Sequence, residues 1–200
     1  MKTRATRDML IDIGTDIIAE QGFNATGINA VLSRAGVPKG SFYHYFSSKE
    51  DFGLAVIDAF AEAHDRRLAD VFEDVGISPL ERLRRFLALG KADMASCDHS
   101  RGCLIGNLGQ ELSARNEVFR ARLDGVLSAW ERRLVDCLEQ AQADGQVPAD
   151  LDPSALAAFI MAGWEGAILR AKTVKSPAPM ECFEEILFTR VLTPDGLIPS

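Results

Sequence analysis

Apolar residues recur every three to four positions along most of the chain, which is the spacing of amphipathic helices. No segment shows the alternation that is typical of a half-buried strand, so the pattern predicts an all-α fold. Glycines, prolines and candidate capping residues indicate where nine helices begin and end. The nine expected helices span residues 4–21, 27–34, 38–46, 49–74, 79–96, 103–114, 117–145, 153–175 and 180–192.

The second and third of these helices are short and are joined by Ala35-Gly36-Val37, a tight turn that contains glycine. A helix, a short glycine turn and a second helix form the helix-turn-helix pattern of DNA-binding proteins. In the third helix, Phe42, Tyr45 and Phe46 are spaced i, i+3, i+4 and share an expected core face. The opposite face carries small, hydroxyl-bearing or cationic residues and no carboxylate: Lys39, Gly40, Ser41, Tyr43 and His44.

The distribution of charge along the chain also indicates a DNA-binding segment. The 200 residues carry a net charge of −7, yet no Asp or Glu occurs between Glu20 and Glu50, the longest such gap in the chain. The first fifty residues hold six Lys or Arg and five Asp or Glu, so the remainder carries −8. Carboxylates are unfavourable where phosphates approach, so this segment is expected to be the surface that touches DNA.

The rest of the composition sets the class of protein. A hydrophobic fraction of 47% is enough for a packed core. We find no apolar run near the length of a membrane span and no signal peptide, and therefore expect a cytoplasmic protein. Its four cysteines, at 97, 103, 137 and 182, are then expected to be thiols. The expected organisation is a DNA-binding head, residues 1–48, followed by a body, residues 49–200.

At this point the residues resemble a known family. Thr26, 35–37, 39–41, 43–46 and 48–50 are similar to the signature of TetR-family repressors. This resemblance covers about a quarter of the chain and implies an all-α homodimer. Each subunit would have a three-helix head and a six-helix body that binds a ligand, and the last two helices would form the dimer interface.

A second resemblance lies in the body. Residues 101–111, RGCLIGNLGQE, and 163–172, GWEGAILRAK, look like acrylate-responsive repressors and, more loosely, like repressors that sense N-ethylmaleimide and other electrophiles. In the electrophile-sensing branch the cysteine of a Gly-Cys-Leu segment is the reactive one, which corresponds to Cys103 here. The resemblance therefore implies an effector that is small and unsaturated or electrophilic.

Two sets of residues follow as candidates for binding. The DNA-binding candidates supply a cation, a hydroxyl, an amide or a close approach of the backbone to phosphates and bases, although a solvated helix face is the simpler alternative. They are Thr26, Lys39, Gly40, Ser41, Tyr43, His44 and Lys49. The ligand-binding candidates surround the two body segments or are large aromatic residues of the body. They are Arg101, Cys103, Asn107, Gln110, Trp130, Trp164 and Glu165.

The sequence leaves two interpretations of the role of Cys103 open. Beside Arg101 and at a helix N-terminus, its thiol is a candidate for modification by an unsaturated ligand or an oxidant. A free cysteine is also often a small buried hydrophobe. Glu165 could likewise orient a ligand, or pair with Arg170 or a residue of a dimer mate.

The expected function is that of a repressor that a small molecule releases from a palindromic DNA operator, with no cofactor and no membrane partner. One alternative is covalent switching of the same repressor at Cys103. An enzyme that uses Cys103 is disfavoured, because no His–Asp pair accompanies it, and Cys97, His99 and Cys103 lack the further ligands of a metal site. An adaptor with a vestigial head is the third alternative. The predicted dimer residues are apolar and lie in the last two helices: Phe159, Ile160, Ile168, Phe183, Ile186, Leu187 and Val191.

Overall fold

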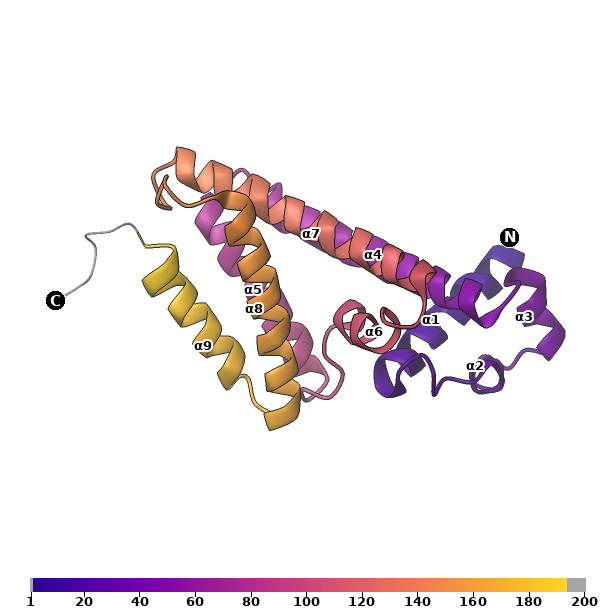
Figure 1. The fold of residues 1–200 in the computed structure, drawn as a ribbon. Helices are drawn as coiled ribbons and strands as arrows, with labels where there is room; N and C mark the ends of the chain where they lie inside the picture. The colour runs from indigo at the N-terminus through magenta and orange to yellow at the C-terminus, as the bar shows by residue number, and fades with distance from the viewer. Residues whose placement is uncertain (1, 194–200) are drawn as a thin grey trace. The chain divides into compact units, whose positions relative to one another are not determined.

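The computed structural model describes residues 2–193 and the side chains from Ala5 to Thr193. Nine α-helices, one short π-helix and no strand occur in this part of the chain, which confirms the all-α prediction (Figure 1). The helices are α1 (Lys2–Gln21), α2 (Ile28–Ala35), α3 (Lys39–Tyr45), α4 (Lys49–Phe72), α5 (Pro79–Ser96), α6 (Leu104–Leu112), α7 (Glu117–Ala143), α8 (Pro153–Val174) and α9 (Ala178–Ile186), followed by the π-helix η1 (Leu187–Val191).

The ends of the helices follow from local chemistry. The Ser78 hydroxyl accepts the Glu81 N–H at 3.3 Å and caps α5, and the Asn116 side chain accepts the Phe119 N–H at 3.0 Å ahead of α7. Gly22 and Gly36 follow α1 and α2 with φ of 84° and 66°, the left-handed conformation that favours glycine. These ends lie within two residues of their predicted positions.

Two details differ from the prediction. The helix expected over residues 27–34 begins one residue later, at Ile28, because Gly27 occupies the N-cap of α2, and no side chain caps that end. The last helix is not a continuous α-helix over residues 180–192, because α9 ends at Ile186 and the chain continues in the π-helix η1. A π-helical turn shifts the direction of the side chains after it, which periodicity alone does not indicate.

The chain divides into two compact units, and α4 and α7 each contribute to both. The first unit comprises the described part of Met1–His64 with Leu104–Val126, and the second comprises Asp65–Cys103 with the described part of Leu127–Ser200. This is a division by packing, and the functional division after residue 48 stays a prediction.

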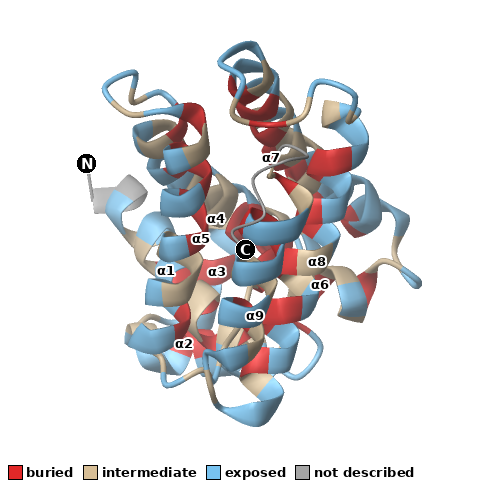
Figure 2. Ribbon diagram, turned by 90° about the vertical axis from the view of Figure 1, so that its left-hand side faces the viewer, coloured by how far each residue is buried: buried red, intermediate tan, exposed pale blue. Residues whose placement is uncertain are grey.

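Buried positions line one side of most helices (Figure 2). In the first unit, Phe42, Phe46 and Phe52 form an aromatic cluster with ring centroids 4.9–5.3 Å apart, and all three side chains are buried. This cluster joins α3 to α4 and thereby fixes which face of α3 is outward.

In the second unit, α5, α8 and α9 pack together, and Arg82 on α5 is buried. Its guanidinium donates to the Phe72 and Asp74 carbonyl oxygens and to the Gln140 side chain, at 2.8–3.2 Å. A buried cation is tolerated only with such partners, and here the partners tie the end of α4 to α5 and α7.

Helix α8 has the length and composition of a membrane span, with a mean hydropathy of 1.2 over its most apolar window. This finding differs from the prediction that the chain contains no apolar run near the length of a membrane span. Leu156, Ile160 and Trp164 on α8 are nevertheless buried in the second unit, as is typical of a core helix.

Candidate functional site

The outward face of α3 is built by the aromatic cluster beneath it. With Phe42 and Phe46 held inside, Lys39, Gly40, Tyr43 and His44 are exposed and Ser41 is half-buried. A Cβ atom added at Gly40 would meet no other atom within 4 Å, so this surface is open. The five residues therefore present donors and a bare backbone on one short helix, as the pattern predicts.

Thr26 lies in a different environment. It is buried, its hydroxyl donates to the Gly22 carbonyl oxygen at 2.7 Å, and its N–H donates to the Phe23 carbonyl oxygen at 3.1 Å. The hydroxyl and the N–H of Thr26, its two donors, are thus engaged inside the turn between α1 and α2. Thr26 shapes this turn, and its contact with DNA stays a prediction.

Lys49 is half-buried and contacts the same turn. Its ammonium donates to the Asn24 carbonyl oxygen at 3.2 Å and lies 4.6 Å from the centre of the Phe23 ring. Burial lowers the pKa of Lys49, and the nearby carboxylate of Glu111 partly offsets this. Sequence reasoning missed Glu111, which accepts the N–H groups of Phe23 and Asn24 at 2.8 and 2.6 Å. No local signal marks that role, because the partners are almost ninety positions away.

In the second unit, Cys103 immediately precedes α6 and is half-buried. Its side chain is hydrogen-bonded to Glu165 of α8. Burial raises the pKa of Glu165, and the hydrogen bond from Cys103 only partly offsets that effect. The structure thus brings together two of the predicted ligand residues, a thiol and a carboxyl group, in one hydrogen-bonded pair.

The other predicted ligand residues are distributed between the units. Trp130 and Trp164 are buried in the second unit, where the Trp164 indole packs on Gly90 of α5. Arg101, also in the second unit, is half-buried in the loop before Cys103. Asn107 and Gln110 belong to α6 in the first unit, where Asn107 is half-buried and Gln110 is exposed.

The remaining thiols differ from one another. Burial acts to raise the pKa of Cys97, but hydrogen bonds from the backbone N–H groups of Arg101, Ser100 and Gly102 and from the Ser100 side chain outweigh it, and the pKa is lowered. Burial raises the pKa of Cys137 to about 11, only partly offset by Arg82, so this thiol is inert. Among the described residues, no group of three His, Cys, Asp or Glu side chains is arranged to hold a metal ion.

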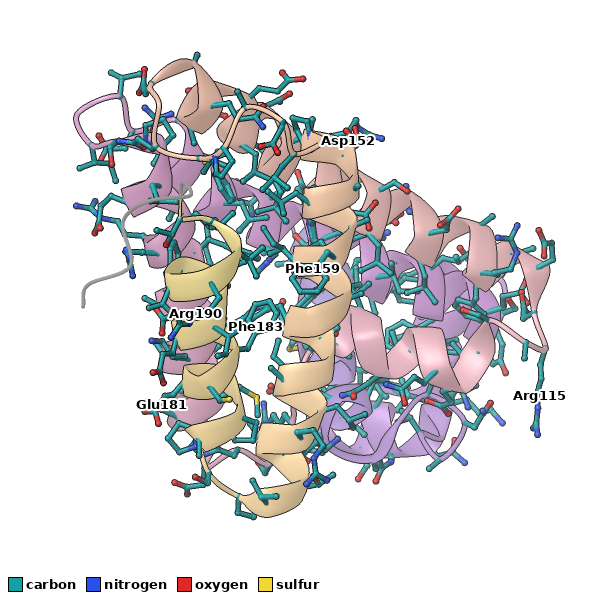
Figure 3. All side chains as sticks on the ribbon, turned by 60° about the vertical axis from the view of Figure 1, so that its left-hand side comes forward. Arg115, Asp152, Phe159, Glu181, Phe183 and Arg190 are labelled. Atoms are coloured by element: carbon teal, nitrogen blue, oxygen red, sulfur yellow. The ribbon has the colours of Figure 1, made fainter. Side chains whose placement is uncertain are left out.

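The predicted dimer residues fall into two groups. Phe159 and Ile186 are exposed, and Phe183 and Val191 are half-buried. Ile160, Ile168 and Leu187 are buried within the protomer and pack its own core. In Figure 3 Phe159 on α8 and Phe183 on α9 lie side by side, with ring centroids 6.4 Å apart.

Comparisons with known proteins identify the family of the chain. Residues 10–56 match the family described as bacterial regulatory proteins, tetR family, and residues 79–187 match the tetracyclin repressor-like C-terminal domain. Transcriptional regulator AcuR of Cereibacter sphaeroides is 48% identical over 174 residues, 87% of this chain and 80% of that protein. The transcriptional repressor DhaR of a Mycobacterium species, strain GP1, is 34% identical over 200 residues, 100% of this chain and 96% of that protein.

Among solved structures, the reduced form of NemR from Escherichia coli superposes with a TM-score of 0.85 at 29% identity and covers 95% of this chain and 99% of that one. All of these relatives are regulators of transcription, in agreement with the expectation that the chain is not an enzyme.

Proposed function

The chain belongs to the TetR family and is a DNA-binding transcriptional repressor, and we propose that a small unsaturated or electrophilic molecule releases it from its operator. The observation that carries this proposal is the hydrogen-bonded pair of Cys103 and Glu165. A thiol and a half-buried carboxyl group together suit a small ligand that has both a polar end and a polarised double bond.

The pair supports two triggers. In reversible binding, the raised pKa of Glu165 makes its neutral form more accessible, and a neutral carboxyl group can donate to the carboxylate of a small acid. In covalent switching, the Cys103 sulfur would add to the β-carbon of the double bond. The thiol proton would pass to Glu165 and then to the α-carbon.

We favour reversible binding, because residues 101–111 and 163–172 resemble acrylate-responsive repressors more closely than electrophile-sensing ones. The resemblance and the family also support a cytoplasmic homodimer that binds a palindrome. Two recognition helices would then enter successive major grooves about 34 Å apart. An effector that binds better to a state with misplaced heads would shift the population away from DNA.

A gel-shift assay with a palindrome from the upstream region of the gene tests this function, using sodium acrylate as the effector. Cys103→Ser keeps the size and hydrogen bonding of the side chain but removes the nucleophile. We expect this variant to be released by acrylate without added mass. Mass spectrometry of Cys182, whose side chain is exposed, serves as the control for indiscriminate alkylation.

Two results would contradict the proposal at different levels. If the variant stays on DNA while acrylate releases the wild type with one adduct at Cys103, the covalent trigger replaces the reversible one. If neither acrylate nor N-ethylmaleimide releases the wild type, the proposed effector class is wrong.

A further inference from the structure

The turn between α1 and α2 is held by two residues that lie far from it in the sequence. The Glu111 carboxylate accepts the N–H groups of Phe23 and Asn24, one on each oxygen. The Lys49 ammonium donates to the Asn24 carbonyl oxygen and lies over the Phe23 ring. All four residues belong to the first unit.

The position of the Glu111 carboxylate depends on the glycine at position 22. Gly22 has a φ of 84°, and a Cβ atom there would lie 2.9 Å from a Glu111 oxygen, so a side chain at this position would displace the carboxylate. Two backbone N–H groups directed at one carboxylate form charge-assisted hydrogen bonds, which are stronger than bonds between neutral groups. The turn and the carboxylate therefore fit each other, and a shift of either would break both bonds.

The turn in question sets the position of the helix-turn-helix. It leads through Thr26, whose hydroxyl is bound to the Gly22 carbonyl oxygen, directly into α2 and then α3. Glu111 lies in the last turn of α6, next to α1 in the first unit (Figure 1). The first residue of α6, Leu104, directly follows Cys103.

We propose that Glu111 is a positioning residue for operator binding: it holds the α1–α2 turn in the form that binds DNA, and it is the point at which α6 acts on the helix-turn-helix. The second half of this statement rests on the proposed function, because it takes the effector to displace α6 near Cys103. An N–H···O distance of 2.6–2.8 Å exceeds hydrogen-bonding range after a displacement of about 1 Å, so small movements of α6 release the turn.

The first experiment compares Glu111→Ala and Glu111→Gln with Glu117→Ala. Glu117 is an exposed carboxylate of the same unit that pairs with Arg120 on its own helix, so its removal changes the charge equally. Operator affinity is measured by fluorescence anisotropy, and amide hydrogen exchange is measured at Phe23 and Asn24. Glutamine keeps one acceptor oxygen, so it should restore part of what alanine loses.

We expect Glu111→Ala to weaken operator binding at least tenfold and to speed exchange at Asn24 at least tenfold. Glu111→Gln should fall between it and the wild type, and Glu117→Ala should match the wild type. Operator affinity within twofold of the wild type in Glu111→Ala would overturn the proposal. So would loss of cooperative unfolding in both Glu111 variants, because the residue would then serve only the fold.

The second experiment adds sodium acrylate to the wild type and follows the same two amides. Release of DNA with faster exchange at Asn24 supports the link through α6, whereas release with unchanged exchange overturns the link. If acrylate does not release DNA, the proposed effector fails. The first experiment then still decides whether Glu111 positions the turn.

Discussion

At the scale of single residues, Lys39 offers the simplest test of the DNA-binding face. It is exposed in the first turn of α3. Lys39→Ala should weaken binding to all DNA sequences alike and lower the slope of log K against log salt by about 0.9, the value for one phosphate. Arg132→Ala removes an exposed cation of the second unit and should change neither quantity. An unaltered salt slope in Lys39→Ala would remove this residue from the interface.

Glu165 should make stability depend on pH. Because burial raises its pKa in the folded protein, the folded state keeps a proton at pH values just above the ordinary 4.5, where the unfolded chain has lost it. The free energy of unfolding should therefore fall as pH rises through the folded pKa. Glu165→Gln remains neutral, so its stability relative to the wild type should increase over that range and then level off.

Urea unfolding between pH 4.5 and pH 8 measures this difference at fixed protein concentration. Glu139→Gln removes an exposed carboxylate of α7 and should give a difference that does not vary with pH. A pH-independent difference for Glu165→Gln as well would mean that the carboxyl group titrates alike in the folded and unfolded chain.

Which residues could be assigned from the sequence depends on how far away their partners are. The exposed face of α3 follows from the spacing of Phe42 and Phe46, since a helix that buries these rings must turn the opposite side outward. From the sequence alone, Thr26 and Lys49 fit the role of phosphate ligands as well as the residues of α3 do. Their actual partners, however, lie in a turn whose conformation also depends on Glu111. Pairings over that distance leave no periodic signal.

At the scale of helices, the packing of α8 on α9 depends on the absence of a side chain at Gly163. A methyl group there would overlap the ring of Phe183, which projects from α9 toward α8 (Figure 3). Gly163→Ala should lower the free energy of unfolding by about 1–2 kcal/mol, since overpacking costs roughly 1–3 kcal/mol and helix propensity returns up to about 1 kcal/mol.

Gly125→Ala is the matched control for that substitution. Gly125 is also inside a long helix, α7, but a Cβ atom at this position would meet nothing within 4 Å. The control should gain up to about 1 kcal/mol from propensity alone. Equal gains in the two variants, measured by urea unfolding, would show that α9 moves aside without cost.

The first and last residues of most helices could be predicted from the sequence better than the contacts between helices. Pro79 and Pro153 begin α5 and α8 where the sequence places them, because a capping side chain and a proline act within one turn. The end of α9 was not predictable in this way. The switch to the π-helix at Leu187 occurs where Leu187 and Phe188 are buried, and burial depends on tertiary packing.

At the scale of the whole molecule, α8 leaves one face uncovered. Six of its exposed positions recur at helical spacing and are small or apolar: Ala155, Ala158, Phe159, Ala162, Gly166 and Leu169. Ile186 on α9 is exposed as well. Exposed apolar residues of this kind are typical of interaction sites, and we expect two such helices from each of two subunits to form a four-helix interface.

The predicted interface can be tested by placing charges on it. Phe159 and Ile186 are 52% and 50% exposed, so aspartate at both positions leaves the protomer core intact. We expect Phe159→Asp with Ile186→Asp to sediment as a monomer at micromolar concentration, where the wild type is a dimer. Its operator affinity should also fall at least a hundredfold, because each head then binds its half-site without a tethered partner.

Val75→Asp is the control, since Val75 is 88% exposed in the second unit but lies in the turn between α4 and α5. It should remain dimeric and bind the operator as the wild type does. Ile160 and Leu187 are unsuitable for this test, because both are buried in the protomer and a charge there would unfold it. A double variant that stays dimeric would place the interface elsewhere, whereas a dimer that dissociates with no loss of operator affinity would separate dimerisation from DNA binding.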